Sequence, residues 1–382
     1  MRRYAGPTRP APYLAMGAGT TVSGLLMLTV GALLVGGLAV AQNSNINLPP
    51  GWKQVPQGTG ACSVAKSCAE LAPEMIQSAL KASALEENLQ ILARLDQSDL
   101  TGLRAAQPAV DWAAEALRKS GAGRVATERL AASGGDAAEA VIVSGEIRGR
   151  EKPEDFVLLG ARFDAPDSGD SILDAGADVA VVIDAARVIQ SSGSIPRRSV
   201  RFVLFIDTRQ AQPGARAYVA AHSAELDRMM AAIFFGVGTE PITGYSLSGR
   251  QDIQAAAREA LAPVRALGVN EFTLEAELRP DILDFLLQGI PTLVANKERK
   301  NRIPCARTDT GAYAPVTVAE LKRHVAIAAV SSYALADAEE RIGPRQTRAR
   351  IEQLIKDTGL DRQMKQEGLW SAWQNGERGR PQ

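Results

Sequence analysis

The feature that most constrains the fold of this chain is an alternation, between residues 140 and 295, of short apolar runs with helical patterns. Helical spacing of apolar residues is clearest over 177–190, and 215–222 and 252–267 behave similarly. Apolar runs separated by helices are typical of strands buried on both faces. We therefore predict an α/β fold with a mixed, mostly parallel central sheet flanked by helices on both faces. The predicted strands are 140–147, 157–161, 200–206, 231–235 and 291–295.

Helical patterns also lie on both sides of this region. Residues 86–95 and 109–120 are expected to be helical, and a long helix is expected over 318–341. Gly343-Pro344 ends that helix and precedes a charged helical tail that contains Trp370 and Trp373. These tryptophans either pack back on the domain or form a surface for a partner.

The N-terminal region carries no charged residue between Arg9 and Lys53, and residues 25–41 are almost wholly apolar. Basic residues precede this stretch, and Ala39-Val40-Ala41 ends it, as in a secretory signal cleaved before Gln42. Residues 13–41 are also long enough to be an uncleaved anchor in the inner membrane. In both cases we expect the rest of the chain to be exported, in the periplasm or outside the cell.

These patterns divide the chain into four expected parts. Residues 1–41 are a signal peptide or membrane anchor, and 42–85 are a linker with a helix that begins near Cys68. Residues 86–341 form the main domain, and 342–382 form a C-terminal helical extension.

Charge and cysteine content narrow the function classes. The chain has 43 basic and 43 acidic residues and no basic stripe, which argues against a nucleic-acid partner. In an oxidising compartment Cys62 and Cys68 could form a disulfide across a short loop, and two unpaired thiols are the alternative. Cys305 is then left over.

Unusual polar residues follow two of the predicted strands. Arg162, Asp164 and Asp174 come after the run 157–161, and Thr208 and Arg209 come shortly after the run 200–206. In an open α/β sheet, ligands bind beyond the carboxyl ends of the strands. This edge of the sheet is therefore the first place to expect a site.

Four segments in order carry a resemblance to a known family. The segments are VLLGARFD (157–164), LDAGADVA (173–180), RRSVRFVLF (197–205) and GARAYV (214–219). They resemble the co-catalytic zinc aminopeptidases and plasma glutamate carboxypeptidases, and the resemblance extends over about 86–341. It implies a zinc exopeptidase fold, in which two zinc ions share a bridging aspartate and a glutamate acts as general base.

The resemblance also assigns the family's site positions to this sequence. Asp174 matches the bridging aspartate, and Asp164 matches the aspartate that orients the first histidine ligand. The other positions carry residues that the family's chemistry does not use. They are Arg162 for the first histidine, Thr208 for the base, Arg209 for the following glutamate ligand, Gly236 for an aspartate ligand, and Cys305 for the last histidine, four residues before Asp309-Thr310.

This pattern suggests that the fold was kept while metal binding was lost. Arg162 and Arg209 would bring permanent positive charge to the place of two dications. We hypothesise that they neutralise Asp164 and Asp174 and lock the old cleft, although a cleft open to water is the alternative. The chain's two histidines, His222 and His324, lie in helical stretches and are expected on the surface or in helix packing.

The sequence thus predicts a catalytically inactive peptidase homologue that works by binding, with no catalytic residue, metal or cofactor expected. The partner would be a peptide or protein, held in the old cleft, on the surface or on the tail. One alternative is a metal-dependent exopeptidase that holds zinc in an atypical site. Another is a hydrolase with Cys305 as nucleophile, although neither histidine is well placed to serve as its base.

Overall fold

The computed structural model describes residues 67–81, 83–94, 103–131, 139–163, 172–207, 214–236, 238–297 and 315–381, all within one compact unit. The predicted signal or anchor segment and Cys62 lie outside these residues. Among the helices of the described residues, none is long and apolar enough to cross a membrane.

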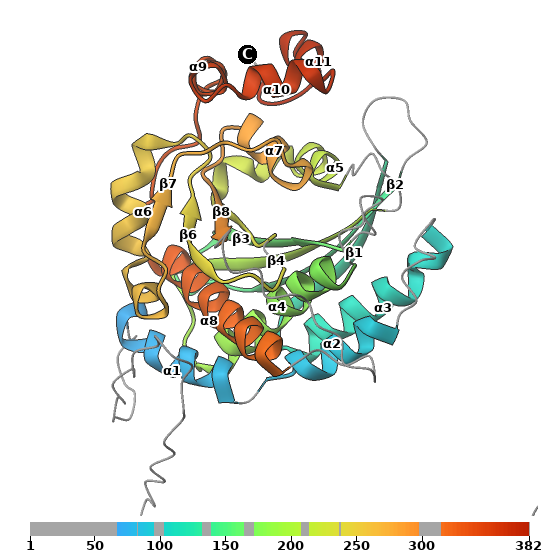
Figure 1. Cartoon of the computed structure of the whole chain (residues 1–382), viewed down its shortest axis with the longest axis vertical. Coiled ribbons are helices and arrows are strands. Elements are labelled where there is room, and N and C mark those ends of the chain that lie inside the picture. The colour runs from blue at the N-terminus through green and yellow to red at the C-terminus, as the bar shows by residue number, and fades with distance from the viewer. Residues whose placement is uncertain are drawn as a thin grey trace, which may run out of the picture. The chain divides into compact units, whose positions relative to one another are not determined.

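An eight-stranded sheet, in the order β1-β2-β4-β3-β5-β8-β6-β7, forms the centre of the described fold (Figure 1). Strands β3, β4, β5 and β8 form a parallel block, β6 and β7 are also parallel, and the other three pairings are antiparallel. The predicted mixed, mostly parallel sheet is confirmed. The strands are β1 Gly123–Ala131, β2 Glu139–Ile147, β3 Lys152–Arg162, β4 Arg198–Asp207, β5 Met229–Phe234, β6 Ile242–Ser246, β7 Glu271–Thr273 and β8 Thr292–Lys297.

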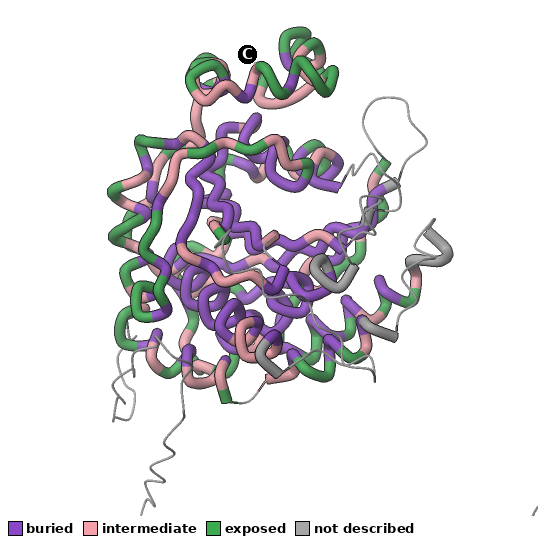
Figure 2. Tube along the Cα trace, viewed as in Figure 1, coloured by how far each residue is buried: buried purple, intermediate pink, exposed green. Residues whose placement is uncertain are grey.

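Side chains of the central strands alternate between two apolar cores. In β3, Val157 and Leu159 belong to the larger core, whereas Phe156 and Leu158 belong to the core on the opposite face. Because successive side chains of a strand point to opposite faces, a run that is apolar at every position must be covered on both sides. Figure 2 shows these strands buried almost throughout.

Helices supply the two covers. The larger core contains residues of α1, α2, α3, α4 and α8, and the smaller contains residues of α5 and α7. The predicted helix near Cys68 is α1, and it contributes five buried residues rather than serving only as a linker. The helices are α1 Cys68–Lys81, α2 Leu85–Arg94, α3 Leu103–Lys119, α4 Ile172–Ser191, α5 Gly214–Ala221, α6 Gln254–Ala260, α7 Pro280–Leu287 and α8 Pro315–Asp337.

Three strands, and an interruption of the helix expected over 252–267, were not predicted. Strand β1 lies at the sheet edge with all of its residues exposed or half-buried, so it lacks an apolar run. Strands β6 and β7 are only five and three residues long. The expected helix over 252–267 is divided into 3₁₀ turns η3 (Gln251–Ile253) and η4 (Ala262–Leu267) around α6, because Pro263 cannot donate a helical hydrogen bond.

The C-terminal tail folds as α9 (Arg348–Asp357), α10 (Leu360–Gln366) and α11 (Trp370–Gln374). Trp373 is buried in a third apolar cluster that joins the tail to α7, and Trp370 packs at its margin. The expectation that the tail tryptophans pack back on the domain is confirmed.

Candidate functional site

Two predicted site positions lie at neighbouring strand ends. Arg162 is the last residue of β3, and Gly236 comes two residues after β5. The two strands are parallel, and their last pair, Gly160 with Phe234, precedes Arg162 and Gly236 by two residues each. Arg162 and Gly236 therefore both lie just beyond the last β3–β5 pair, at the carboxyl edge of the sheet. The Arg162 side chain is half-buried there.

The other predicted positions are described in part or not at all. Asp174 lies in the first turn of α4, but only its backbone is described. Asp164, Thr208, Arg209 and Cys305 lie outside the described residues. Their roles, like the pairing of Cys62 with Cys68, stay predictions.

Gly236 is packed directly against the guanidinium of Arg279, the residue that precedes α7. A Cβ atom at Gly236 would lie 2.7 Å from Cζ and 2.8 Å from Nη1 of Arg279, and closer still to Nη2. Contacts below 3.0 Å do not occur for real Cβ atoms, so one of the two groups would have to move. The space next to the end of β5 is therefore filled by a cation from another element.

Arg279 is fixed in this position by Asp281. Its Nη2 donates a hydrogen bond of 2.7 Å to Asp281 Oδ2, and its Nε donates one of 3.3 Å to Oδ1. The Asp281 carboxylate is only 2% exposed. A charge-assisted pair with two parallel hydrogen bonds is strong and directional. The guanidinium therefore cannot turn away from Gly236 without leaving the buried Asp281 carboxylate without its partner.

Further carboxylates contribute to the electrostatics around Arg279. Burial by itself lowers the pKa of Arg279, but the charge and hydrogen bonds of Asp281 outweigh it, with smaller contributions from Asp178 and Glu277, so the pKa is raised. Asp178 is buried and lies in α4, four residues after Asp174. The arginine thus supplies positive charge among carboxylates at the place where the resemblance implied metal.

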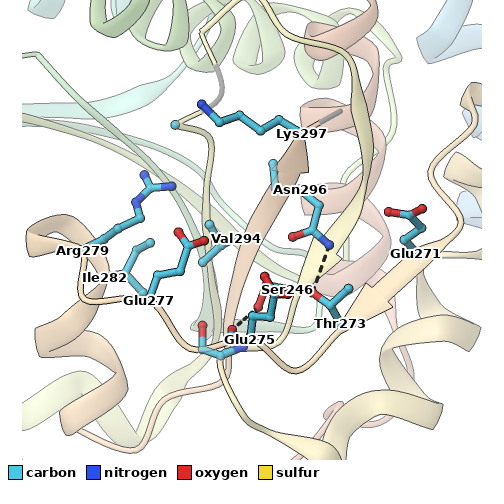
Figure 3. Close-up of a pocket in the computed structure, with 13 residues that line it drawn as sticks. Ser246, Glu271, Thr273, Glu275, Glu277, Arg279, Ile282, Val294, Asn296 and Lys297 are labelled. Carbon is cyan, nitrogen blue, oxygen red and sulfur yellow. Dashed lines mark hydrogen bonds between the residues drawn. The ribbon is translucent and has the colours of Figure 1, made fainter. Parts of the chain in front are cut away.

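A cavity of about 340 Å³ opens beside this arginine, at the carboxyl ends of β5 and β8 (Figure 3). Gly236 and Arg279 line it together with residues of β6, β7, β8 and the segment before α7. The remaining lining residues are Ser246, Ser248, Glu271, Thr273, Glu275, Glu277, Ile282, Val294, Ala295, Asn296 and Lys297.

Hydrogen bonds hold several of the polar lining residues in place. Asn296 Nδ2 donates to Thr273 Oγ1 at 3.1 Å, and the Ser246 hydroxyl donates to the Glu275 carbonyl. Lys297 Nζ lies 2.7 Å from Glu240, so its charge is paired. The walls thus combine polar side chains held by hydrogen bonds with the apolar side chains of Ile282, Val294 and Ala295.

Sequence reasoning missed Arg279. It precedes Pro280 in a segment that matches none of the family's site motifs, and it is far from Gly236 along the chain. The one available signal was the missing aspartate at Gly236, which left a space to be filled.

The three described positions at this strand end supply no metal ligand. Gly236 has no ligating side chain, and the Arg162 and Arg279 guanidiniums are cations. In the part of the chain that the structure describes, no three His, Cys, Asp or Glu side chains meet as a metal site would require.

The histidines lie elsewhere. His324 in α8 is fully buried, with Nε2 3.3 Å from Glu320. His222 follows α5, with Nδ1 2.6 Å from Glu225 and Nε2 3.1 Å from Glu128 of β1. His324 is a helix-packing residue, as expected, whereas His222 is half-buried and contacts two carboxylates.

Comparison with known sequences agrees with this fold. The family model for peptidase family M28 matches residues 142–329. Carboxypeptidase Q of Rattus norvegicus is 24% identical over 197 residues, and that of Homo sapiens is 26% identical over 202 residues. Each match covers 52% of this chain, and the chain spans only 42% of the length of each relative.

Solved structures share the fold at lower identity. A peptidase M28 precursor from Shewanella amazonensis aligns with a TM-score of 0.60 and 17% identity, covering 73% of this chain and 99% of that one. The LapA aminopeptidase of Legionella pneumophila aligns with a TM-score of 0.53 and 14% identity, covering 74% and 79%. Taken together, the family model, the carboxypeptidase Q matches and this shared fold support a relationship of the chain to peptidase family M28, the co-catalytic zinc aminopeptidase-like family.

Proposed function

We propose that this chain is a catalytically inactive member of its family that acts outside the cytoplasm by binding a peptide or protein. The observation that carries the proposal is the contact between Gly236 and Arg279. At the position assigned to a metal-binding aspartate there is no side chain, and a guanidinium fills the adjoining space.

The charge of Arg279 supports this proposal. The Arg279 guanidinium, a permanent cation held by Asp281, repels a dication at short range. Displacing the guanidinium would leave the buried Asp281 carboxylate without its partner. Arg162 adds a second cation at the neighbouring strand end, where the family uses a histidine. By the resemblance, the base and two further ligands are also replaced, by Thr208, Arg209 and Cys305.

A role in binding is supported by what the fold retains. The cavity beside Arg279 has polar lining residues fixed by hydrogen bonds as well as apolar ones, and it lies at the carboxyl edge of the parallel strands, where α/β folds bind ligands. The apolar N-terminal stretch supports export, with or without a retained membrane anchor.

Metal analysis of the purified protein, combined with hydrolysis of aminoacyl reporter substrates, tests the loss of catalysis. We expect less than stoichiometric zinc after dialysis against zinc, and no turnover above buffer. Near-stoichiometric zinc with turnover that a chelator abolishes would contradict the proposal.

Two variants identify the source of any turnover. Asp174→Asn would abolish activity from an atypical metal site, because this aspartate is the one retained ligand position. Cys305→Ser would abolish activity from a cysteine nucleophile and leave metal-dependent activity in place. In an inactive homologue neither variant changes the background rate.

A further inference from the structure

Helix α7 is buried to an unusual degree for a helix that covers a sheet. Every residue from Asp281 to Leu287 is buried. A helix of a surface layer normally exposes its outer face to water, so a second layer must cover α7. Figure 1 shows the C-terminal helices α9, α10 and α11 on the side of α7 away from the sheet.

The apolar contacts of α7 fall into two sets. Ile282 and Phe285 belong to the core between α7 and the sheet. Leu283, Leu286 and Leu287 instead join a separate cluster with the tail. The tail contributes Ile351, Ile355, Leu360, Met364 and Trp373 to that cluster.

Polar contacts fix the tail at a defined place on this helix. Arg378 donates two hydrogen bonds of 2.7 Å to the Asp284 carboxylate, and both side chains are almost fully buried. The Arg380 backbone amide donates to the Leu287 carbonyl at 2.9 Å. Arg348 lies 3.8 Å from the centre of the Trp373 ring and donates to the Arg380 carbonyl at 2.7 Å.

The opposite end of the same helix forms part of the cavity. Arg279 is the residue immediately before α7, and Asp281, in the first turn of the helix, holds the Arg279 guanidinium against Gly236. Ile282 also lines the cavity. Asp284 is less than one helical turn beyond Asp281, so a shift of α7 that follows loss of the tail must move the groups that line the cavity.

We propose that residues 348–380 are a clamp that sets the position of α7 and, through it, the shape of the cavity. With the clamp docked, Arg279 stays against Gly236. With the clamp released, α7 loses one of its two apolar covers, and the segment 279–287 together with the end of β5 opens locally. Any factor that displaces the tail therefore controls access to the cavity. The proposal does not depend on whether the protein is catalytic.

Hydrogen exchange on the full chain tests the clamp. Arg378→Ala removes the buried ion pair and leaves Asp284 without its partner. We expect amides of 279–287 and 232–236 to exchange at least tenfold faster than in the parent, whereas amides of β2 and β4 keep their rates. Lys356→Ala is the matched control, since it removes an exposed tail pair with Glu352 and should change neither region.

A milder variant covers the case in which Arg378→Ala does not fold. Arg378→Lys keeps the charge but loses the parallel pair of hydrogen bonds, so a smaller acceleration in the same two regions is expected. Acceleration confined to residues 348–380 in the folded variants would overturn the proposal. Equal acceleration in β2 and β4 would also overturn it, since that is global destabilisation.

Discussion

The Arg279 guanidinium occupies the space that a side chain at Gly236 would need, although Gly236 follows β5 and Arg279 precedes α7, 43 residues later in the chain. The arginine is held in place by Asp281, which is buried. Glycine at 236 and arginine at 279 are therefore mutually dependent, and this dependence can be measured.

Gly236→Ala should destabilise the protein by about 1–3 kcal/mol, because overpacking displaces a group that is held by a buried carboxylate. In an Arg279→Ala background the same substitution should cost close to nothing. Urea unfolding of the four proteins gives the coupling free energy. Gly123→Ala is the control, since its Cβ would meet nothing closer than 3.5 Å. Equal costs in both backgrounds would rule out the contact.

Arg279→Ala should itself reduce the free energy of unfolding by about 2–3 kcal/mol, because Asp281 is left buried without its partner. This loss of stability is smaller than for a fully buried ion pair, because the arginine side chain is 23% exposed. Removing both charges, in Arg279→Ala/Asp281→Ala, should cost less than Arg279→Ala alone. Arg118→Ala, in an exposed pair, should change stability by less than about 0.5 kcal/mol. A double variant less stable than the single one would contradict this account.

His222 should make stability depend on pH. The hydrogen bond with Glu225 raises the pKa of His222 above 6.5, and the charge of Glu128 adds to this effect. Burial and the charge of Arg201 act against it, but they are outweighed. Tyr218 stacks on the ring. The stabilisation is complete below about pH 6.5 and is lost as pH rises through the folded-state pKa.

The stability contributed by Glu225 depends on pH in the opposite direction, since it is lost at low pH rather than at high pH. Its hydrogen bond with His222, with help from Arg201, lowers its pKa to about 2, so its contribution is present above its ordinary value of 4.5 and lost as pH falls toward 2. Thermal melts of the parent and His222→Gln from pH 4 to 9 should differ most between about pH 4.5 and 6.5 and converge at high pH. If the melting temperatures of the two proteins differed by the same amount at every pH from 4 to 9, protonation of His222 would not contribute to stability.

Arg162→Ala should lower the melting temperature by about 2–4 °C if Arg162 locks the old cleft, which corresponds to roughly 1 kcal/mol for a domain of this size. Arg148→Ala, which removes an exposed ion pair, is the matched control. A melting curve unchanged from the parent would favour the alternative, in which Arg162 is simply solvated.

The central fold could be predicted because a strand that is buried on both faces has apolar residues at successive positions in the sequence. All five predicted strands are present, as β2, β3, β4, β5 and β8. Each has apolar residues at successive positions, and that pattern is independent of the partner strand. Strand β1 has no such pattern, since its place at the sheet edge buries little of it.

The candidate site was predictable only where motif positions sit on strand ends. Arg162 and Gly236 could be assigned to the carboxyl edge of the sheet because each follows a predicted strand. Arg279 could not be placed, since its contact with Gly236 depends on how α7 lies against the sheet.

The sequence by itself thus predicted the sheet, its helical covers and the resemblance to the zinc exopeptidases. Only the tertiary structure decided which group fills the space at Gly236, and that the tail covers the outer face of α7. The physical reason is that these contacts join segments far apart in the chain. Their partners are selected by shape and charge in three dimensions, which no local periodicity encodes.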